Sequence, residues 1–241
     1  MSKVKMEVIA AEITKIDDIN DRITYYEFSV DLKYGLTYVP GQFLMLIMPN
    51  DPRPVRRAYS IASTPNEISK GLLKLCITAV EGGKVSNWIR TKKVGETVEF
   101  KAPYGKFVLP ETLPPEIHYI SVGTGIVPFR CMIIDLFEKG CDTDIYLYHG
   151  NRHENSILYD EEFKEIAAQH SNFHYFPCIS RPTDNWQGDK GYVQNKVKEV
   201  LTTAGDRSFY ICGVNAMIEE VCDYLLSIGH EKEQIHYEKY D

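Results

Sequence analysis

The sequence lacks the clustered cysteines that zinc sites and iron–sulfur segments need. His149 and His153 lie four residues apart, but Gly150 and Asn151 between them indicate a loop, so no metal site is predicted there. No CxxC pair occurs, which argues against either kind of centre and is typical of reduced thiols in a reducing compartment. The six cysteines are scattered: Cys76, Cys131, Cys141, Cys178, Cys212 and Cys222.

Long apolar runs are also missing. No stretch approaches the roughly 18 apolar residues of a membrane span, and the start, MSKVKMEVIA, lacks the apolar core of a signal peptide. Apolar residues make up 44% of the 241 positions and charged residues 25%, which is typical of a soluble globular protein. We therefore expect a cytoplasmic protein without a membrane partner, long enough for two modest domains or one large one.

Positive charge is in short supply over the whole chain. The net charge is −7, which disfavours nucleic acid as a partner. Residues 51–110 nevertheless hold eleven lysines and arginines against five acidic residues, a local balance of +6. A basic region on an acidic protein favours an anionic partner, although a solvated surface is the simpler alternative.

The first hundred residues predict strands rather than helices. Six segments are short, rich in β-branched or aromatic residues, and separated by Gly, Pro, Asn or Asp: 6–14, 23–31, 42–48, 58–63, 72–80 and 97–102. With one helix-like span between them, at about 84–91, they predict a closed six-stranded antiparallel barrel.

Residues 109–116, LPETLPPE, contain three prolines and predict a linker. Beyond it five strands alternate with four helices, which predicts a parallel five-stranded sheet with helices on both faces, a Rossmann-like nucleotide-binding architecture. We place the boundary after residue 112, with a barrel domain at 1–112 and an α/β domain at 113–241.

Residues 56–63, RRAYSIAS, hold a cation, a ring and a hydroxyl on one predicted strand. Arg57 and Tyr59 fall on one face, and Ala58 and Ser60 on the other. Arginine suits a phosphate, a tyrosine ring can lie along an apolar tricycle, and a serine hydroxyl can bond a ring nitrogen. A flavin nucleotide has all three features. An ordinary strand with a solvated arginine is the alternative.

Glycine turns before predicted helices mark two further candidate anion sites. Gly82 and Gly83 precede the helix at 84–91, where free backbone amides favour an anion. Gly123, Thr124 and Gly125 follow the first strand of the second half, a place for a dinucleotide pyrophosphate. A plain hairpin with a surface helix is the alternative for the first turn.

The segment CISRPTDNWQGDKGYV collects polar groups after the third strand of the second half. Ser180, Arg181 and Lys190 suit the extra phosphate on the adenosine ribose of NADP, and Tyr192 can stack on adenine. An arginine on a mobile surface loop is the alternative.

These motifs, in this order, resemble those of the ferredoxin–NADP(+) reductase family of FAD-dependent NAD(P)H oxidoreductases, which includes flavin reductases. Residues 57–60 resemble its RxYS flavin motif, and residues 123–128 its GTGxxP motif. Gly83, Lys84, Val85 and Ser86 are similar to its flavin-pyrophosphate segment. The loop at 180–192 is similar to plant-type members, whereas its Pro182 and Trp186 look more like NAD-using relatives; NADP is favoured and NAD stays open.

The resemblance also implies roles for the end of the chain. Cys212 and Gly213 match a CG pair beside the nicotinamide, although a buried inert thiol is a common alternative. Glu238 and Tyr240 match a terminal acid and aromatic, with Asp241 as one additional residue. Ser60, Cys212, Glu238 and Tyr240 are then expected at the reacting rings.

The function implied is an FAD-dependent enzyme that passes hydride from NADPH to the flavin and then single electrons to an acidic ferredoxin or flavodoxin, acting as a monomer. Two alternatives stay open at this point. One is an NAD(P)H:flavin reductase that treats free flavin as a substrate. The other is a non-catalytic dinucleotide-binding subunit of an electron-transfer complex.

Overall fold

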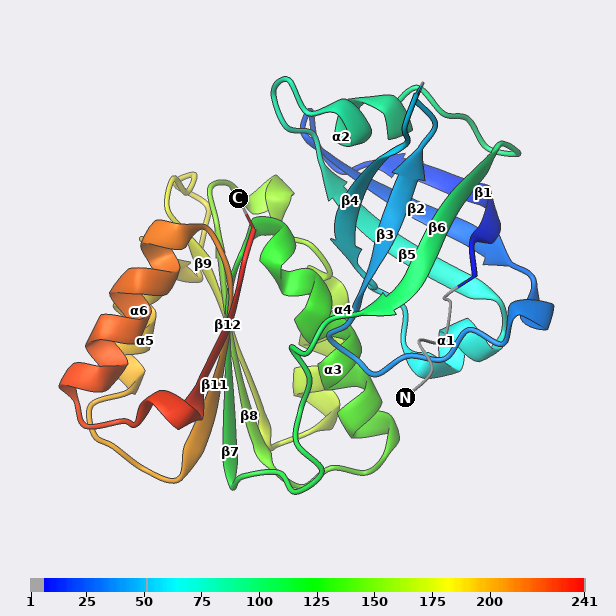
Figure 1. Cartoon of the computed structure of the whole chain (residues 1–241). Coiled ribbons are helices and arrows are strands. Elements are labelled where there is room, and N and C mark those ends of the chain that lie inside the picture. Colours follow the sequence, from blue (N-terminus) through cyan, green and yellow to red (C-terminus); the bar gives the residue numbers. More distant parts are fainter. Residues whose placement is uncertain (1–6, 51, 241) are drawn as a thin grey trace. The chain divides into compact units, whose positions relative to one another are not determined.

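The computed structural model describes residues 7–50 and 52–240 and divides into two compact units (Figure 1). Unit 1 comprises the described residues up to Val108 together with Val127–Lys139, and unit 2 comprises Leu109–Ile126 and the described residues from Gly140 onward. The chain therefore returns to unit 1 for one helix. The boundary after residue 112 stays a prediction. Among the described residues, no helix is both long and apolar enough to cross a membrane.

Unit 1 is built on an antiparallel sheet with the strand order β4-β3-β6-β1-β2-β5. The sheet closes where the amide of Ala62, just beyond β4, donates to the carbonyl of Lys74 in β5 at 3.0 Å. The predicted six-stranded antiparallel barrel is confirmed. The strands are β1 (Ile9–Asp18), β2 (Ile23–Val30), β3 (Phe43–Met48), β4 (Val55–Ser60), β5 (Leu72–Thr78) and β6 (Thr97–Tyr104).

Alternation of side chains explains why these segments form a barrel. On β5, Leu73, Leu75 and Ile77 are each 1% exposed and point to the same side, because strand side chains repeat every two residues. They join one continuous core with residues from the other strands. Each buried aliphatic side chain contributes about 1.5–3 kcal/mol, so the register of the barrel is firmly set.

Unit 1 also contains two short helices and one longer helix. They are α1 (Pro65–Ser69), α2 (Lys84–Ile89) and α3 (Val127–Glu138), with a 3₁₀ turn at Leu32–Tyr34. The strand pattern did not predict α1. Its signal is present, however: the Thr64 hydroxyl accepts from the Glu67 amide at 3.2 Å, and the Glu67 carboxylate accepts from the Thr64 amide at 2.8 Å. This reciprocal cap is typical of a helix start.

Strand β4 differs from its predicted range. The prediction was 58–63, whereas β4 spans Val55–Ser60 and the next residues leave the sheet. Apolar character misled the prediction, because Ile61 and Ala62 are fully buried without being part of the sheet ladder. Their backbone groups bond to other parts of unit 1 instead.

Unit 2 is built on a parallel sheet with the order β10-β9-β8-β7-β11-β12. The predicted Rossmann-like architecture is confirmed. The sixth strand, β10, was not predicted because two residues are too few for a periodic pattern. The strands are β7 (Glu116–Val122), β8 (Asp144–Asn151), β9 (Phe173–Ile179), β10 (Asp189–Lys190), β11 (Arg207–Gly213) and β12 (Ile235–Lys239).

Helices cover both faces of this sheet. On one face, Val193 and Val197 of α5 and Val221 of α6 join the cluster around Ile120 and Ile211. On the other face, Phe163 of α4 lies against the ring of Tyr175, with centroids 5.5 Å apart. All six strands end at one edge, their carboxyl edge, where nucleotides bind in such sheets. The helices are α4 (Asp160–Gln169), α5 (Val193–Val200) and α6 (Asn215–Ser227), with 3₁₀ turns at Gly123–Ile126, Glu154–Ser156 and Lys232–Gln234.

Candidate functional site

Strand β4 carries the predicted flavin motif and is the first strand in the barrel's order. Arg57 and Ala58 are exposed and Ser60 is 7% exposed. Tyr59 is half-buried, pairs in register with Leu44 and packs against the barrel core. Burial raises the pKa of Tyr59 to about 12, although Arg57 opposes the shift, so the phenol keeps its proton at neutral pH. The motif thus offers a half-buried ring beside an exposed guanidinium.

The segment before α2 is tightly built. A Cβ at Gly83 would lie 2.6 Å from the Oγ of Ser86, so any larger residue there would displace the Ser86 hydroxyl. Ser86 is buried, and its hydroxyl accepts from the amide of Val80 at 3.2 Å. Val85 is buried in the core, whereas Lys84 is exposed. Ser86 therefore shapes the loop, and Lys84 presents the charge that a phosphate would meet.

The glycine turn after β7 packs directly against the end of β11. A Cβ at Gly125 would lie 2.2 Å from the carbonyl oxygen of Cys212, which no side chain could tolerate. Gly123, with φ of 55°, and Gly213, with φ of 150°, adopt backbone angles that favour glycine. The predicted turn at 123–125, which includes Thr124, and the predicted CG pair are therefore brought together at the carboxyl edge.

Cys212 and Glu238 are register partners on the neighbouring strands β11 and β12. Burial raises the pKa of the Cys212 thiol well above its usual range, and the Glu238 carboxylate adds to the shift, so the thiol is neutral. Burial also raises the pKa of Glu238 to about 6. The amide of Tyr240 donates to the carbonyl of Gly213 at 3.0 Å, which holds the chain end beside this pair. Asp241 lies outside the described residues.

A row of polar side chains extends from this pair across two more strands. Register pairs Cys212 with Ser121 of β7, and Ser121 with His149 of β8. The Oγ of Ser121 lies 2.9 Å from Nδ1 of His149. Burial lowers the pKa of His149 to about 3, so its ring is neutral. We did not predict Ser121 or His149 as site residues, because single polar residues on a buried strand form no motif.

Three polar atoms near the carboxyl edge are buried and have no hydrogen-bond partner within the described part of the chain. They are Nε2 of His149, Nδ2 of Asn151 and Oε2 of Glu238. His149 and Asn151 are two residues apart on β8 and share a face. An unpaired buried polar group costs about 1–3 kcal/mol, so such atoms indicate a place where a ligand supplies the partners.

The predicted adenosine-phosphate residues gather at the end of β9. The amide and the hydroxyl of Ser180 both donate to the carbonyl of Asn151, at 3.0 and 3.3 Å. Lys190 on β10 pairs in register with Ile179, the last residue of β9. The side chains of Arg181, Lys190 and Tyr192 are exposed, Tyr192 at 65%. The two cations and the tyrosine ring are therefore accessible to a phosphorylated nucleoside.

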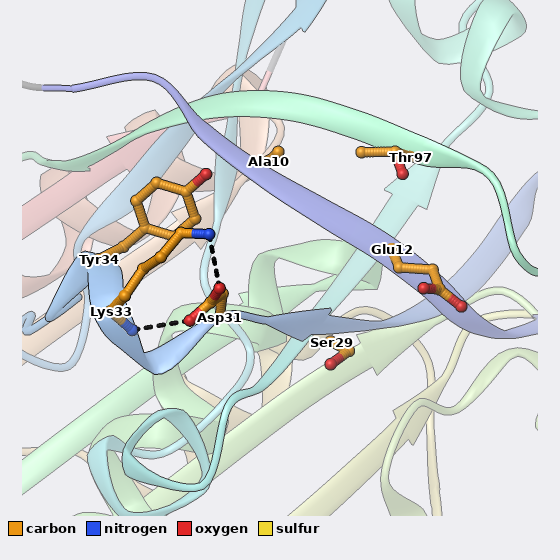
Figure 2. Close-up of a pocket in the computed structure, with 7 residues that line it drawn as sticks. All are labelled: Ala10, Glu12, Ser29, Asp31, Lys33, Tyr34 and Thr97. Carbon is orange, nitrogen blue, oxygen red and sulfur yellow. Dashed lines mark hydrogen bonds and ion pairs between the residues drawn. The ribbon is translucent and has the colours of Figure 1, made fainter.

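Surface hollows in the structure are shallow. One of about 470 Å³ lies beside the adenosine-phosphate loop and is lined by His153 and Thr183, among others. Another, of about 450 Å³, lies on the barrel next to the Asp31–Lys33 ion pair, whose nitrogen and oxygen are 2.7 Å apart (Figure 2). None of the predicted site residues lines the barrel hollow.

His149 and His153, the pair examined for a metal site in the sequence, differ in burial. His149 is fully buried in β8, whereas His153 is exposed and its Nδ1 lies 3.1 Å from the carbonyl of Arg181. Across residues 7–50 and 52–240, no group of three or more metal-ligating side chains comes together.

Comparison with known proteins identifies two nucleotide-binding domains in the chain. The family model described as oxidoreductase FAD-binding domain matches residues 10–109, and the oxidoreductase NAD-binding domain matches residues 119–223. Ferredoxin–NADP reductase B of Sorangium cellulosum (strain So ce56) is 30% identical over 245 residues, which cover 99% of this chain and 100% of that protein. The chain belongs to the ferredoxin–NADP reductase family.

Relatives within this family differ in length. The reductase component DmpP of phenol 2-monooxygenase from Pseudomonas sp. (strain CF600) is 31% identical over 82% of this chain, and the match covers 56% of that protein. The chain thus spans the whole of one relative and little more than half of another.

Solved structures of ferredoxin–NADP reductase type share the fold. The Amycolatopsis cytochrome P450 reductase GcoB matches with a TM-score of 0.86 and 25% identity, covering 97% of this chain and 70% of that one. A ferredoxin NADP+ reductase from Neisseria gonorrhoeae with bound FAD and NADP matches with a TM-score of 0.83, at 19% identity, covering 98% and 99%.

The residues present fit the cofactors of the ferredoxin–NADP reductase family. In unit 1, Tyr59 and Arg57 offer a ring and a cation side by side on β4. In unit 2, a glycine turn whose Gly125 leaves no room for a Cβ stands at the carboxyl edge, where buried polar atoms have no partner among the described residues. The chain is an electron-transfer oxidoreductase with an FAD-binding and an NAD(P)-binding domain.

Proposed function

We propose that this chain is a ferredoxin– or flavodoxin–NADP(+) reductase. FAD held by unit 1 would supply a hydride acceptor for NADPH and a donor of single electrons. The observation that carries the proposal is the pairing of Cys212 with Glu238 directly beside the glycine turn of residues 123–125. These features suit the binding of a nicotinamide ring: the thiol is neutral, the acid has a raised pKa, and the backbone can be approached closely. They do not suit a site in which the thiol attacks a substrate.

The chain's own groups would position the nicotinamide. Gly125 and Gly213 keep side chains out of the carboxyl edge, so a flat ring can approach the backbone. The neutral thiol of Cys212 offers a polarisable surface without charge. The free Oε2 of Glu238 can accept from an amide N–H. Tyr240, fastened through its amide, would shield the flavin face until the nicotinamide arrives.

On the barrel, the motif of β4 would hold the flavin. The half-buried ring of Tyr59 would lie along the isoalloxazine, and Ser60 would bond near N5. Arg57 and Lys84 are exposed cations that would meet the two phosphates as charge-assisted partners. Residues 83–86 would set the backbone that approaches the pyrophosphate.

Selection of NADPH over NADH would rest on the adenosine-phosphate loop. Arg181 and Lys190 are exposed at the end of β9, next to the Ser180 hydroxyl. A planar guanidinium binds a phosphate through two donors, which the unphosphorylated ribose of NADH cannot use. Tyr192, 65% exposed, has a ring free to stack on adenine.

The basic part of unit 1 supports an acidic protein as the electron acceptor. Arg53, Arg56 and Arg57 are exposed on or just before β4, the strand that carries the flavin motif. Opposite charge accelerates the encounter of two proteins, and this acceleration falls as ionic strength rises.

The proposal is tested by comparing acceptors with the FAD-loaded chain. NADPH oxidation is measured with a ferredoxin, a flavodoxin or free FMN as the acceptor, at low and high salt. We expect turnover with one of the two proteins and a loss of kcat/KM with salt. Turnover with free FMN alone would identify a flavin reductase, and no turnover with any acceptor or dye would identify a non-catalytic subunit.

A further inference from the structure

The four residues that follow β4 form a buried turn that hydrogen-bonds to several other segments of unit 1. Residues 61–64, the post-motif turn, are at most 1% exposed. The amide of Ala62 donates to the carbonyl of Lys74 at 3.0 Å, and the Ser63 hydroxyl accepts from the amide of Lys74 at 2.7 Å. The hydroxyl of Tyr38 donates to the carbonyl of Ser63. The turn begins one residue after Ser60, so it fixes the end of the flavin motif.

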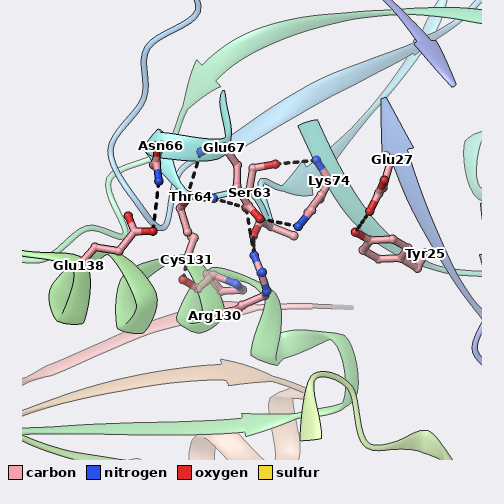
Figure 3. A network of polar contacts seen from close by, with 12 residues as sticks. Tyr25, Glu27, Ser63, Thr64, Asn66, Glu67, Lys74, Arg130, Cys131 and Glu138 are labelled. Atoms are coloured by element: carbon pink, nitrogen blue, oxygen red, sulfur yellow. Dashed lines mark hydrogen bonds and ion pairs between the residues drawn. The ribbon is translucent and has the colours of Figure 1, made fainter. Parts of the chain in front are cut away.

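Glu67 connects this turn to two cations (Figure 3). Its Oε2 accepts from the amide of Thr64 at 2.8 Å and lies 3.3 Å from Nη1 of Arg130, and its Oε1 pairs with the ammonium of Lys74. Burial alone would raise the pKa of Glu67. The two cations and the amide outweigh burial, so the pKa lies below its usual range and the carboxylate stays ionised.

Arg130 connects the same turn to another part of the chain. It is 4% exposed, and its Nη1 donates to the carbonyl of Ala62 at 2.6 Å. Arg130 lies in the first turn of α3, which follows the glycine turn of Gly123–Ile126 without a break. The chain passes from unit 2 into unit 1 between Ile126 and Val127. One guanidinium therefore ties the helix after the dinucleotide turn to the turn after the flavin motif.

We propose that Arg130 is a positioning residue for electron transfer, an inference that rests on the function proposed above. Its contacts with Ala62 and Glu67 lie within unit 1, where they fix the backbone that follows Ser60, the residue proposed to bond near the flavin N5. Reaction at the flavin needs the protein groups around its reacting atom held within a few tenths of an ångström, and a shift of about 1 Å can cost a factor of about 100. Binding of each nucleotide needs less precision.

The test compares Arg130→Met and Arg130→Lys with Lys139→Gln. Lys139 is the matched control because it lies directly after α3 and its ion pair with Asp135, at 2.6 Å, is exposed on the lysine side. In the FAD-loaded chain we expect Arg130→Met to slow flavin reduction by saturating NADPH about tenfold or more, with the KM for NADPH and the Kd for FAD changed less than about threefold. Arg130→Lys should recover part of the rate, and Lys139→Gln should match the wild type.

A second measurement uses the cofactor-free protein. Hydrogen exchange at the amides of residues 61–64 should be faster in Arg130→Met than in the wild type or Lys139→Gln, because the Ala62 bond is lost. If Arg130→Met does not fold, Arg130→Lys and Glu67→Gln take its place. An unchanged rate of flavin reduction, or unchanged exchange at 61–64, overturns the proposal. Failure of the wild type to oxidise NADPH would refute the proposed function instead, and the exchange data would still test the fastening.

Discussion

The post-motif turn of unit 1 and the carboxyl edge of the sheet in unit 2 differ in whether their buried polar groups have partners. In the turn, the Glu67 carboxylate meets an amide and two cations. At the carboxyl edge, buried atoms of His149, Asn151 and Glu238 have no partner among the described residues. The turn satisfies its own polar groups, as a scaffold does, whereas these three atoms of the carboxyl edge could pair with a ligand.

The pKa values of Glu67 and Glu238 reflect this difference and can be measured. Burial favours the neutral acid in both, but the neighbours of Glu67 lower its pKa, whereas burial raises the pKa of Glu238 to about 6. Substitution should therefore cost stability at Glu67 and function at Glu238.

Glu67→Ala should lower the free energy of unfolding by about 3–5 kcal/mol, because it leaves two cations without their buried carboxylate. Denaturant unfolding of the FAD-free chain measures this cost. Glu99→Ala, which removes an exposed glutamate from β6, should change stability by less than about 0.5 kcal/mol. A cost below about 1 kcal/mol at Glu67 would show that the network is not a scaffold.

Gly125→Ala should disrupt the carboxyl edge, because its Cβ would meet the Cys212 carbonyl oxygen at 2.2 Å. We expect a loss of about 2–3 kcal/mol in stability and a kcat/KM for NADPH at least about tenfold lower, with FAD still bound to unit 1. Gly140→Ala is the control, since nothing lies within 4 Å of its added Cβ; its φ of 73° alone should cost about 1 kcal/mol, and its activity should be normal. Equal behaviour of the two variants would refute the close approach.

Arg181→Ala should reduce the preference for NADPH over NADH. Loss of a charged phosphate contact costs about 1.5–3 kcal/mol, which corresponds to a ratio of kcat/KM values roughly ten- to a hundredfold smaller. The measurement is kcat/KM for both cofactors. Lys164→Ala removes an exposed cation from α4 and should leave the ratio unchanged. An unchanged ratio in Arg181→Ala would remove Arg181 from cofactor selection.

Glu238→Gln should change the pH dependence more than the stability. The folded-state pKa of about 6 lies above the usual value of 4.5, so the stabilisation from the buried neutral acid is present below about pH 4.5 and is lost as the pH rises through about 6. The variant should therefore gain stability relative to the wild type between about pH 5 and about pH 8. The rate of flavin reduction should lose its inflection near pH 6. An inflection retained in the variant would assign it to another group.

Periodicity and turn residues were sufficient to predict both architectures, because strand alternation and the change to alternating helices and strands are local patterns. The motif residues at 123–125, 180–181 and 212–213 do lie at the carboxyl edge. What the sequence could not show is pairing over distance. Glu67 and Arg130 are 63 residues apart, and no local pattern connects them.

Local apolar character also misled the range of one strand. Ile61 and Ala62 are as apolar as a barrel strand, yet they form a turn, because Gln42 supplies the backbone partner of Ile61 and Lys74 and Arg130 supply those of Ala62. Similarly, a helical period predicts α3 but does not show that it packs with unit 1. In both cases, contacts with residues distant in the sequence determine the structure: the range of β4 and the unit to which α3 belongs.

The central claim is that this chain binds FAD and NADPH so that electrons pass between them. It is tested most directly by anaerobic titration of the purified, FAD-loaded protein with NADPH while its visible spectrum is recorded. The account predicts one tightly bound FAD per chain whose yellow colour disappears with one equivalent of NADPH. A chain that binds no FAD, or whose bound FAD keeps its colour in excess NADPH, would contradict it.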